Sequence, residues 1–383
     1  MTTNKNHNSP NVPNLRFPEF EGEWKKTKFG DIATGFDYGM NAAAKNYDGV
    51  NKYIRITDID EASSTYTDKD IVSPDGILTD NYLVNNRDIL LARTGASTGK
   101  SYLYKQSDGK LYYAGFLIRA NVTTHDPYFV FSQLHTHRYW RWVSIMSARS
   151  GQPGINSQEY SSFPIYTTSI EEESKIAKLL SLLDERIATQ NKIIEDLKKL
   201  KSAISERLFK SVKGSIVLLS DICDIVKGKQ INGENLSERG RYYVMNGGTE
   251  PSGYYDDYNV EANTISISEG GNSCGYVQFN TFPFWSGGHC YSIQNVTGNV
   301  DNLYLYHYLK SNEDNIMKLR IGSGLPNIQK KDLAMFKIIV PTLEQQMTIS
   351  TFLSSIERKA EIERRIQNAI QKQKLYLLQQ MFI

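Results

Sequence analysis

The chain has 383 residues, 40% of them hydrophobic and 22% charged, with a formal net charge of +2, which is the composition of a globular protein of two or three domains. This balance neither requires nor excludes a nucleic-acid ligand, but a DNA-binding protein of this kind would have to concentrate its Lys and Arg on one surface. The three cysteines (Cys223, Cys274 and Cys290) are scattered, which argues against a disulfide framework or a zinc site and favours a reducing cytoplasm. The polar N-terminus argues against a secretion signal, and the lack of a long apolar run argues against a membrane span.

A glycine-rich loop in the first third of the chain, ARTGASTGKSY from Ala92, raises the question of nucleotide binding. A P-loop has four residues between its two glycines, so that backbone N–H groups surround the phosphates, whereas only Ala96, Ser97 and Thr98 separate Gly95 from Gly99. The segment aligns with NTISISEGGNSCGYVQF in the second half, and both indicate two strands joined by a glycine-containing turn. No helix N-terminus is predicted there to supply a dipole. We therefore expect a tight hairpin that binds no nucleotide.

The regions around these loops predict mixed α/β domains. SYLYKQSDGKLYYAGFLIRANV, from Ser101, alternates like a strand and contains an Asp-Gly turn, which predicts a further hairpin. Two later segments, YFVFSQLHTHRYWRWVSIM and LYLYHYLKSNEDNIMKL, predict the helices that end the two domains.

The chain repeats itself. SGQPGINSQEYSSFPI from Ser150 matches SGLPNIQKKDLAMFKI from Ser323, and SIEEESKIAKLLSLLDERI from Ser169 matches TLEQQMTISTFLSSIERKA from Thr342. The shift is the same for both pairs, and it continues without a gap for about sixty residues. The sequence therefore alternates variable domains with repeated segments, and the turns at Ser150 and Ser323 are expected to fix each domain to the helix after it.

The repeated segments predict two long helices with a coiled-coil seam. Their apolar residues are spaced alternately four and three apart, and neither segment contains Pro or Gly from Ser174 to Lys213 or from Met347 onward. Each helix is expected to run for about 40 residues, or roughly 60 Å. Lys201 and Lys374 occupy equivalent seam positions, which favours a register set by polar residues. An amphipathic helix packed on its own domain is the alternative.

Other signs of catalytic chemistry are weak. His135 and His137 are two residues apart and would lie on different helix faces, His289 is expected to be packed or in a polar contact, and the carboxylates of TDIDEASSTYTDKD suit a solvated loop. The sequence contains neither a methyltransferase Asn/Asp-Pro-Pro-aromatic motif nor a dinucleotide fingerprint nor a nucleophile elbow. We therefore expect a protein that is not an enzyme.

Three segments resemble the specificity subunit of type I restriction–modification systems, which serve bacterial defence. They are NLRFPEFEGEW near the N-terminus, SIEEESKIAKLLSLLDERI after the first domain and TLEQQMTISTFLSSI after the second, and YVMNGGTEPSGYYDDYN from Tyr243 resembles the start of that family's second target-recognition domain. The order of the segments agrees along the whole chain. One departure is that the helix-start consensus Glu-Gln-Gln is Glu171-Glu172-Glu173 in the first copy and intact at Glu344-Gln345-Gln346 in the second.

The resemblance implies an α/β (α+β) fold in which two globular target-recognition domains are separated by two long antiparallel coiled-coil helices with a pseudo-twofold repeat. It implies that each domain reads one half of a bipartite double-stranded DNA site, that the helices bind two methyltransferase subunits, and that restriction/translocase subunits join this core. S-adenosylmethionine, ATP and Mg²⁺ would belong to those partners and not to this chain, and no membrane is involved. The expected boundaries are an N-terminal arm at 1–23, recognition domains at 24–168 and 214–341, a central spacer helix at 169–213 and a C-terminal spacer helix at 342–383.

The expected DNA contacts follow from side-chain chemistry. Arg and Lys suit guanine, Asn and Gln suit adenine, and Glu suits the cytosine amine, while phosphate contacts supply affinity. The candidates are Arg55, Arg93, Thr94, Ser97 and Lys100 in the first domain, Lys227, Lys229, Gln230, Asn246, Glu269 and Asn272 in the second, and Arg149 and Arg320 as phosphate contacts at the two domain–helix junctions.

Two other functions fit parts of the pattern. One is a coiled-coil scaffold with two protein- or carbohydrate-binding domains, and the other is a stand-alone nuclease or methyltransferase. Binding that weakens steeply with salt would favour DNA over the scaffold, and activity without partners would favour the enzyme.

Overall fold

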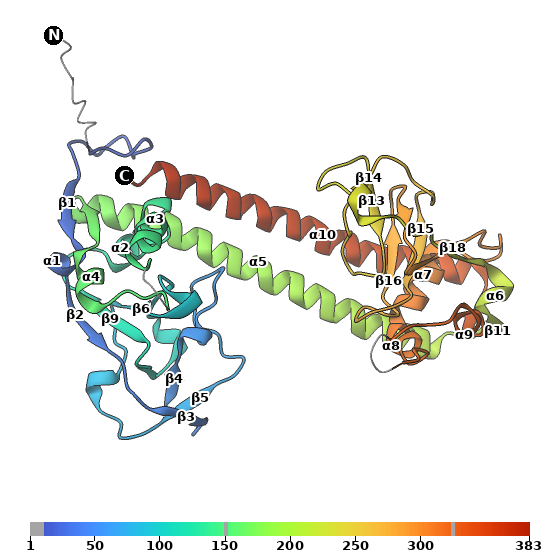
Figure 1. The fold of residues 1–383 in the computed structure, drawn as a ribbon, viewed down its shortest axis with the longest axis horizontal. Coiled ribbons are helices and arrows are strands. Elements are labelled where there is room, and N and C mark those ends of the chain that lie inside the picture. The colour runs from blue at the N-terminus through green and yellow to red at the C-terminus, as the bar shows by residue number, and fades with distance from the viewer. Residues whose placement is uncertain (1–10, 149–151, 323–325) are drawn as a thin grey trace, which may run out of the picture. The chain divides into compact units, whose positions relative to one another are not determined.

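The computed structural model describes residues 11–148, 152–322 and 326–383 (Figure 1). The chain divides into two compact units, Met1–Thr189 with Gln367–Ile383 and Gln190–Ile366. Two long helices, α5 (Ile170–Ser211) and α10 (Leu343–Gln380), each contribute to both units. Their ranges agree with the two helices expected from the repeat.

The first unit is built on a four-stranded antiparallel sheet in the order β2-β9-β6-β7. All residues of β6, with the sequence DILLA, are buried. Its strands are β1 (Lys25–Lys28), β2 (Ala33–Tyr38), β3 (Ala43–Asn46), β4 (Lys52–Ile54), β5 (Val72–Asp75), β6 (Asp88–Ala92), β7 (Ser101–Leu103), β8 (Leu111–Tyr113), β9 (Leu117–Val122) and β10 (Pro164–Thr167). Its shorter helices are α1 (Phe29–Ile32), α2 (Pro127–Gln133), α3 (His137–Met146) and α4 (Ser157–Ser162).

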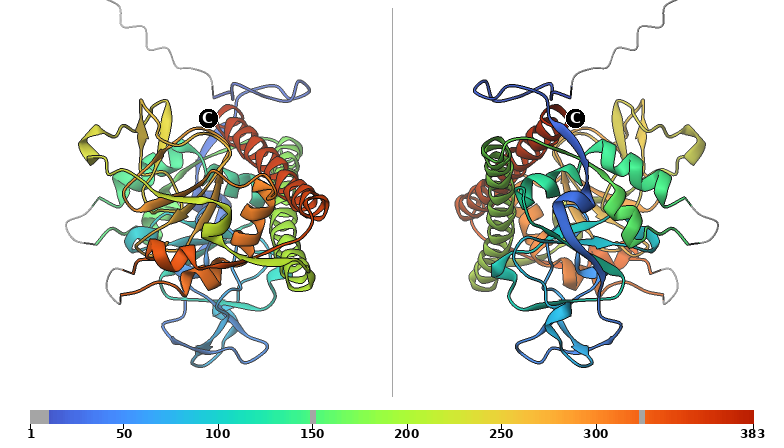
Figure 2. Two further views of the ribbon diagram at one scale, coloured as in Figure 1. Left: turned by 90° about the vertical axis from the view of Figure 1, so that its right-hand side faces the viewer. Right: turned by 90° about the vertical axis from the view of Figure 1, so that its left-hand side faces the viewer.

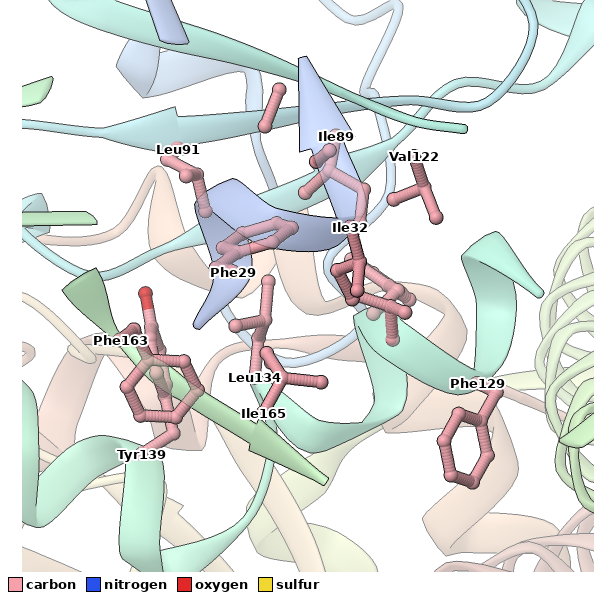
Figure 3. Packing of buried hydrophobic residues seen from close by; sticks show 14 of the residues in the cluster. Phe29, Ile32, Ile89, Leu91, Val122, Phe129, Leu134, Tyr139, Phe163 and Ile165 are labelled. Atoms are coloured by element: carbon pink, nitrogen blue, oxygen red, sulfur yellow. The ribbon is translucent and has the colours of Figure 1, made fainter. Parts of the chain in front are cut away.

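The core of this unit lies between the sheet and its helices. Phe29 and Ile32 of α1 pack with Ile89 and Leu91 of β6 (Figure 3). The cluster also takes in residues from both long helices, because one apolar side of α5 and the C-terminal end of α10 are buried against it. The helix α2 begins at Pro127 because Asp126 caps it by accepting hydrogen bonds from two backbone N–H groups of the first turn.

The expected hairpin from Ser101 to Val122 is wrong. The strand β7 pairs with β6, and β8 pairs in parallel with β4. A short 3-10 turn, Gln106–Asp108, precedes Gly109 at the expected hairpin turn. The Asp-Gly dipeptide does make a turn, but the strands on its two sides belong to different sheets.

The second unit repeats this architecture. Its main sheet has the order β12-β18-β15-β16 and is antiparallel throughout, and β13 pairs in parallel with β17 as β4 does with β8. Its strands are β11 (Ser215–Leu218), β12 (Asp224–Lys227), β13 (Tyr242–Met245), β14 (Tyr254–Tyr255), β15 (Thr264–Ser268), β16 (Val277–Asn280), β17 (Trp285–Ser286), β18 (Cys290–Gln294) and β19 (Lys337–Val340). Its shorter helices are α6 (Leu219–Ile222), α7 (Asn302–Ser311), α8 (Glu313–Met317) and α9 (Lys330–Ala334).

Polar pairs join α5 and α10, which run side by side within each unit (Figure 1, Figure 2). In the first unit Lys374 pairs with Asp184, and in the second unit Lys201 pairs with Glu357. Both lysines are those expected at the seam, so the prediction of polar seam residues is confirmed. The Gln190 side chain also donates to the Glu363 carbonyl oxygen at 3.1 Å.

The N-terminal arm is fastened to the first unit by a buried carboxylate. Arg16 makes two hydrogen bonds of 2.7 Å to Glu172, at the start of α5, and the Trp24 indole N–H lies 3.4 Å from the same carboxylate. The Leu15 N–H donates to the Gln380 carbonyl at 2.9 Å, beside the C-terminus (Figure 2). The arm motif therefore has a structural role in joining the two ends of the chain.

The first turns of the two long helices share one side-chain hydrogen bond and reverse another. Glu173 of α5 accepts hydrogen bonds from the Thr168 N–H at 3.1 Å and the Asp126 N–H at 3.0 Å. Gln346 holds the equivalent place in α10. Its side-chain oxygen also accepts a backbone hydrogen bond, from the Asp301 N–H at 2.8 Å, but its amide nitrogen donates to the Pro341 carbonyl at 2.9 Å. Proline has no N–H to donate. The glutamate at 173, where the consensus has glutamine, therefore fits its surroundings, because the Thr168 N–H donates to it and the proline of the second copy could not.

Candidate nucleic-acid interface

In the first unit the candidate residues gather at the turn between β6 and β7. The strand β7 follows this turn directly, as expected for a hairpin rather than a P-loop. Thr94 bridges to Gly154, and the Gly95 N–H donates to the Pro153 carbonyl at 3.0 Å, so the turn is tied to the segment that leads into α4. Ser97 ends a single 3-10 turn within it.

Arg93 is the first residue after β6, and its guanidinium lies over the Tyr38 ring, 4.8 Å from the centroid. Its Nε atom is buried and has no hydrogen-bond partner among the described residues. Stacking on an aromatic ring holds the guanidinium plane and leaves its outer N–H groups available. Of the first unit's candidates, Arg93 is therefore the best placed to read a base.

The other two cations of the first unit already have carboxylate neighbours. Lys100 lies 3.1 Å from Glu61, whose side chain is 83% exposed, so this pair is weak and can exchange for a phosphate. Arg55 binds Asp58 at 2.8 Å and Asp70 at 3.1 Å, and the hydrogen bond that it donates to Asp58 raises the pKa of the Arg55 guanidinium. Arg55 thus anchors its own loop. Arg149 lies outside the described residues.

In the second unit the candidates surround a buried carboxylate. Glu269 is the first residue after β15 and is only 4% exposed. Its Oε1 accepts hydrogen bonds from Lys227 Nζ at 2.6 Å and from the Tyr291 hydroxyl at 3.1 Å. Burial and the nearby Glu269 carboxylate raise the pKa of Tyr291, so its hydroxyl stays a donor. Glu269 was expected to face a cytosine amine, but this burial keeps its carboxylate from the surface.

A polar rim lies around this carboxylate. The Asn246 side-chain oxygen accepts a hydrogen bond from the His289 N–H at 3.2 Å. Gln230 covers Gly288, where an added Cβ would meet Gln230 Oε1 at 2.4 Å. Gln230 is exposed, and so are Lys227 and His289, with 53% and 63% of their side chains accessible. The structure thus brings four predicted residues together with His289, which sequence reasoning had not proposed as a site residue.

The remaining candidates of the second unit lie apart from this rim. Lys229 is exposed, and its backbone carbonyl accepts a hydrogen bond from the Trp285 indole at 2.9 Å. Asn272 is exposed in the turn between β15 and β16, and Arg320 is exposed after α8. Gly270 and Ile321 both bridge to Asn327, so the loops that carry Asn272 and Arg320 are joined.

The two units place opposite charges at the same point of the same framework. Arg93 follows β6 and Glu269 follows β15, and these strands hold equivalent positions in sheets of the same order. Such a difference on a shared scaffold is what two recognition domains of different specificity require.

Groups capable of other chemistry are buried or bonded. The His135 ring is partly buried, with Nδ1 2.9 Å from the Phe131 carbonyl and Nε2 2.9 Å from the Ser64 hydroxyl. Burial raises the pKa of the Cys223 thiol to about 12 and that of Cys290 to about 11, so both stay protonated. Within the described parts of the chain, no group of three or more His, Cys, Asp or Glu residues is placed to hold a metal ion. None of the helices there is long and apolar enough to cross a membrane.

The first turns of α10 expose apolar side chains. Leu343, Met347 and Phe352 are 45%, 54% and 48% exposed and line a shallow hollow on this helix. Exposed apolar patches of this kind often mark protein–protein contacts.

Comparisons with known proteins agree with this geometry. A family described as the type I restriction modification DNA specificity domain matches residues 21–199 and 214–372. A putative type I specificity subunit of Mycoplasma pneumoniae, S.MpnORF638P, is 32% identical over 145 residues, which is 37% of this chain and 38% of that protein. The type I restriction enzyme MjaVIII specificity subunit of Methanocaldococcus jannaschii is 25% identical over 97% of this chain and 94% of its own length.

The fold agrees with a solved structure. The crystal structure of the type I restriction-modification system S subunit from M. genitalium matches with a TM-score of 0.69, at 18% identity, over 97% of this chain and 99% of that chain. The expected combination of two α/β domains and two long helices is thereby confirmed. With two copies of the domain covering most of its length, the chain belongs to the type I restriction–modification DNA specificity family.

Proposed function

We propose that this chain is the sequence-reading subunit of a type I restriction–modification complex and that each of its two domains reads one half of a bipartite DNA site. DNA recognition is the general role of the family. The observation that carries the bipartite proposal is the difference between Arg93 and Glu269 at one position of a repeated framework, where Arg93 stacks on Tyr38 and Glu269 is buried and paired with Lys227. Two domains that differ in this way would read two different half-sites.

The contacts divide into affinity and specificity. Lys100, Lys227, Lys229 and Arg320 suit phosphate oxygens, because cations bind the backbone without regard to sequence. Arg93 suits the guanine O6 and N7 atoms, and Gln230 and Asn246 suit adenine. Glu269 acts from below the surface, through the residues that it holds.

The chain is proposed to work without a catalytic site of its own. Two methyltransferase subunits would dock on the long helices, and the hollow at Leu343, Met347 and Phe352 gives one such contact an apolar centre. Restriction/translocase subunits would then join this core. S-adenosylmethionine, ATP and Mg²⁺ would be bound by those partners, and the complex would act on DNA in the cytoplasm.

Mapping methylated adenines in DNA exposed to the assembled complex tests this function. We expect methylation at sites with two specified halves separated by an unspecified gap of constant length. The affinity should also fall steeply as salt rises, because released counterions drive binding to DNA. Methylation at a single contiguous site would refute the bipartite arrangement, and binding to a protein or sugar that is insensitive to salt would favour a scaffold instead.

A further inference from the structure

We propose that Lys227 and His289 are a DNA-contacting pair of the second unit, in which His289 reads a base and Lys227 binds a phosphate, and that buried Glu269 is the positioning residue that holds both. The inference rests on the proposed function and names the side chains that carry it out in one half-site. Lys227 Nζ is 2.6 Å from Glu269 Oε1, and His289 Nδ1 is 3.8 Å from Glu269 Oε2.

The carboxylate of Glu269 is incompletely satisfied on the side of His289. Oε1 has two donors, Lys227 and Tyr291, whereas Oε2 is buried and has no hydrogen-bond partner among the described residues. A buried carboxylate oxygen without a donor is costly. His289 Nδ1 lies 3.8 Å from this oxygen, just beyond hydrogen-bond distance, so the proposed contact needs the exposed ring to move closer. The geometry therefore provides a fixed acceptor for a ring that is free to turn.

The backbone of His289 is held while its side chain is left exposed. Its N–H donates to Asn246 at 3.2 Å, and its carbonyl accepts the Glu269 N–H at 2.9 Å. Gly247, with φ at +86°, leaves the space beside it, since an added Cβ would lie 3.0 Å from both the His289 Cβ and its carbonyl oxygen. The ring is 63% exposed on this fixed backbone. This arrangement suits a side chain that points outward to a ligand.

The chemistry of the two side chains is complementary. When Nδ1–H of a neutral histidine donates to Glu269, Nε2 is left as an acceptor on the opposite side of the ring. An outward acceptor suits the exocyclic amine of adenine or cytosine in the major groove. Lys227 carries only donors and is half exposed, so it suits a phosphate oxygen next to that base.

The test uses the complex assembled with its methyltransferase subunits and reads base preference at every position of both half-sites. His289→Ala should lower discrimination at one base pair of the second half-site by about 5- to 150-fold. Lys227→Ala should weaken binding to all sequences alike and reduce the salt slope by about one. Lys337→Ala, an exposed lysine on β19, is the matched control and should change neither.

Glu269→Gln distinguishes a positioning role from a structural one. It should lower discrimination at the same base pair as His289→Ala, and the double variant should discriminate no worse than His289→Ala alone. The amine-bearing base at that pair can also be replaced by an analogue without the amine. This replacement should lower the affinity of the wild-type complex by the same factor as His289→Ala does on unmodified DNA. It should not lower the affinity of the His289→Ala complex any further. An unchanged first half-site in every variant shows that folding and assembly are intact.

Two results would overturn the inference. One is a His289→Ala complex whose preferences match those of the wild type at every position, and the other is a pair of losses from His289→Ala and Glu269→Gln that add independently. A wild-type complex that has no second half-site would instead overturn the proposed function, and this inference with it.

Discussion

Removal of the Arg16 side chain should destabilise the first unit, because it leaves a buried carboxylate without its partner. The Glu172 side chain is 1% exposed and that of Arg16 is 11% exposed, and their contact is bidentate, with both hydrogen bonds at 2.7 Å. Breaking a buried ion pair from one side costs about 3–5 kcal/mol. Trp24 and Thr168 still donate to Glu172 in Arg16→Ala, so we expect the lower end of this range.

A loss of about 3 kcal/mol corresponds to a fall in melting temperature of roughly 6–12 °C for a unit of this size. Calorimetry of the full chain gives that shift, and hydrogen exchange localises it to the N-terminal arm and the start of α5. The matched control is Lys25→Ala, an exposed cation on β1. Arg16→Ala combined with Glu172→Gln should recover part of the loss, because the remaining side chain is neutral.

The reasoning would be refuted if Arg16→Ala lay within about 0.5 kcal/mol of the wild type, which is the range of ordinary surface substitutions. It would also fail if the double variant, in which residue 172 is neutral, were as unstable as Arg16→Ala alone. In either case the arm motif would owe its presence to something other than this ion pair.

Four further predictions follow from the arrangement of domains, loops and helices. Replacing residues 24–149 by the corresponding domain of a relative should change one half of the methylated sequence only, and a change in both halves would contradict modular reading. Lys100→Ala should leave ATP use by the assembled complex intact and lower the salt slope of DNA binding by about one. If the isolated wild-type chain bound a nucleotide and Lys100→Ala abolished that binding, the loop would be a P-loop after all. Four residues inserted between Asp196 and Ser205 lengthen that helix by about 6 Å and should widen the gap by one or two base pairs, whereas one residue turns it by about 100° and should abolish binding; methylation mapping reads both. Burial lowers the pKa of His135 from 6.5 to about 4. Between these pH values the unfolded chain binds a proton at His135 that the folded chain does not bind, so the melting temperature should fall as the pH drops from 6.5 to 4. The fall should be smaller in His135→Gln.

Much of the fold could be predicted because its signals are local or repeated. The spacing of apolar residues along the long helices identified buried positions such as Ile176, Leu180 and Leu353. The two glycine-containing hairpins were also recognisable, since each joins strands that are neighbours in sequence. The failed hairpin at Gly109 shows the limit: β8 pairs with β4, more than fifty residues earlier, and no local pattern encodes that choice.

The candidate site was harder to predict, because exposure depends on tertiary packing. Glu269 looked like a surface reader on a glycine-rich turn, yet β18 and the Tyr291 hydroxyl enclose it. His289 was expected to be packed or in a polar contact. Its N–H does donate to Asn246, but its ring is exposed, at a turn that follows Gly287 and Gly288 and precedes β18. A Gly-Gly-His segment that directly precedes a strand was the signal in the sequence.

The hydrogen bond that is reversed between Glu173 and Gln346 affects how the two repeats can be recombined. A crossover between Thr168 and Glu173 would place a proline before the glutamate, which would lose one of its two backbone donors. The reciprocal product would place a threonine before Gln346. We therefore expect chains recombined between the two repeats to be more stable when the breakpoint lies outside that five-residue interval, so that the end of each domain stays with the first turn of its own helix.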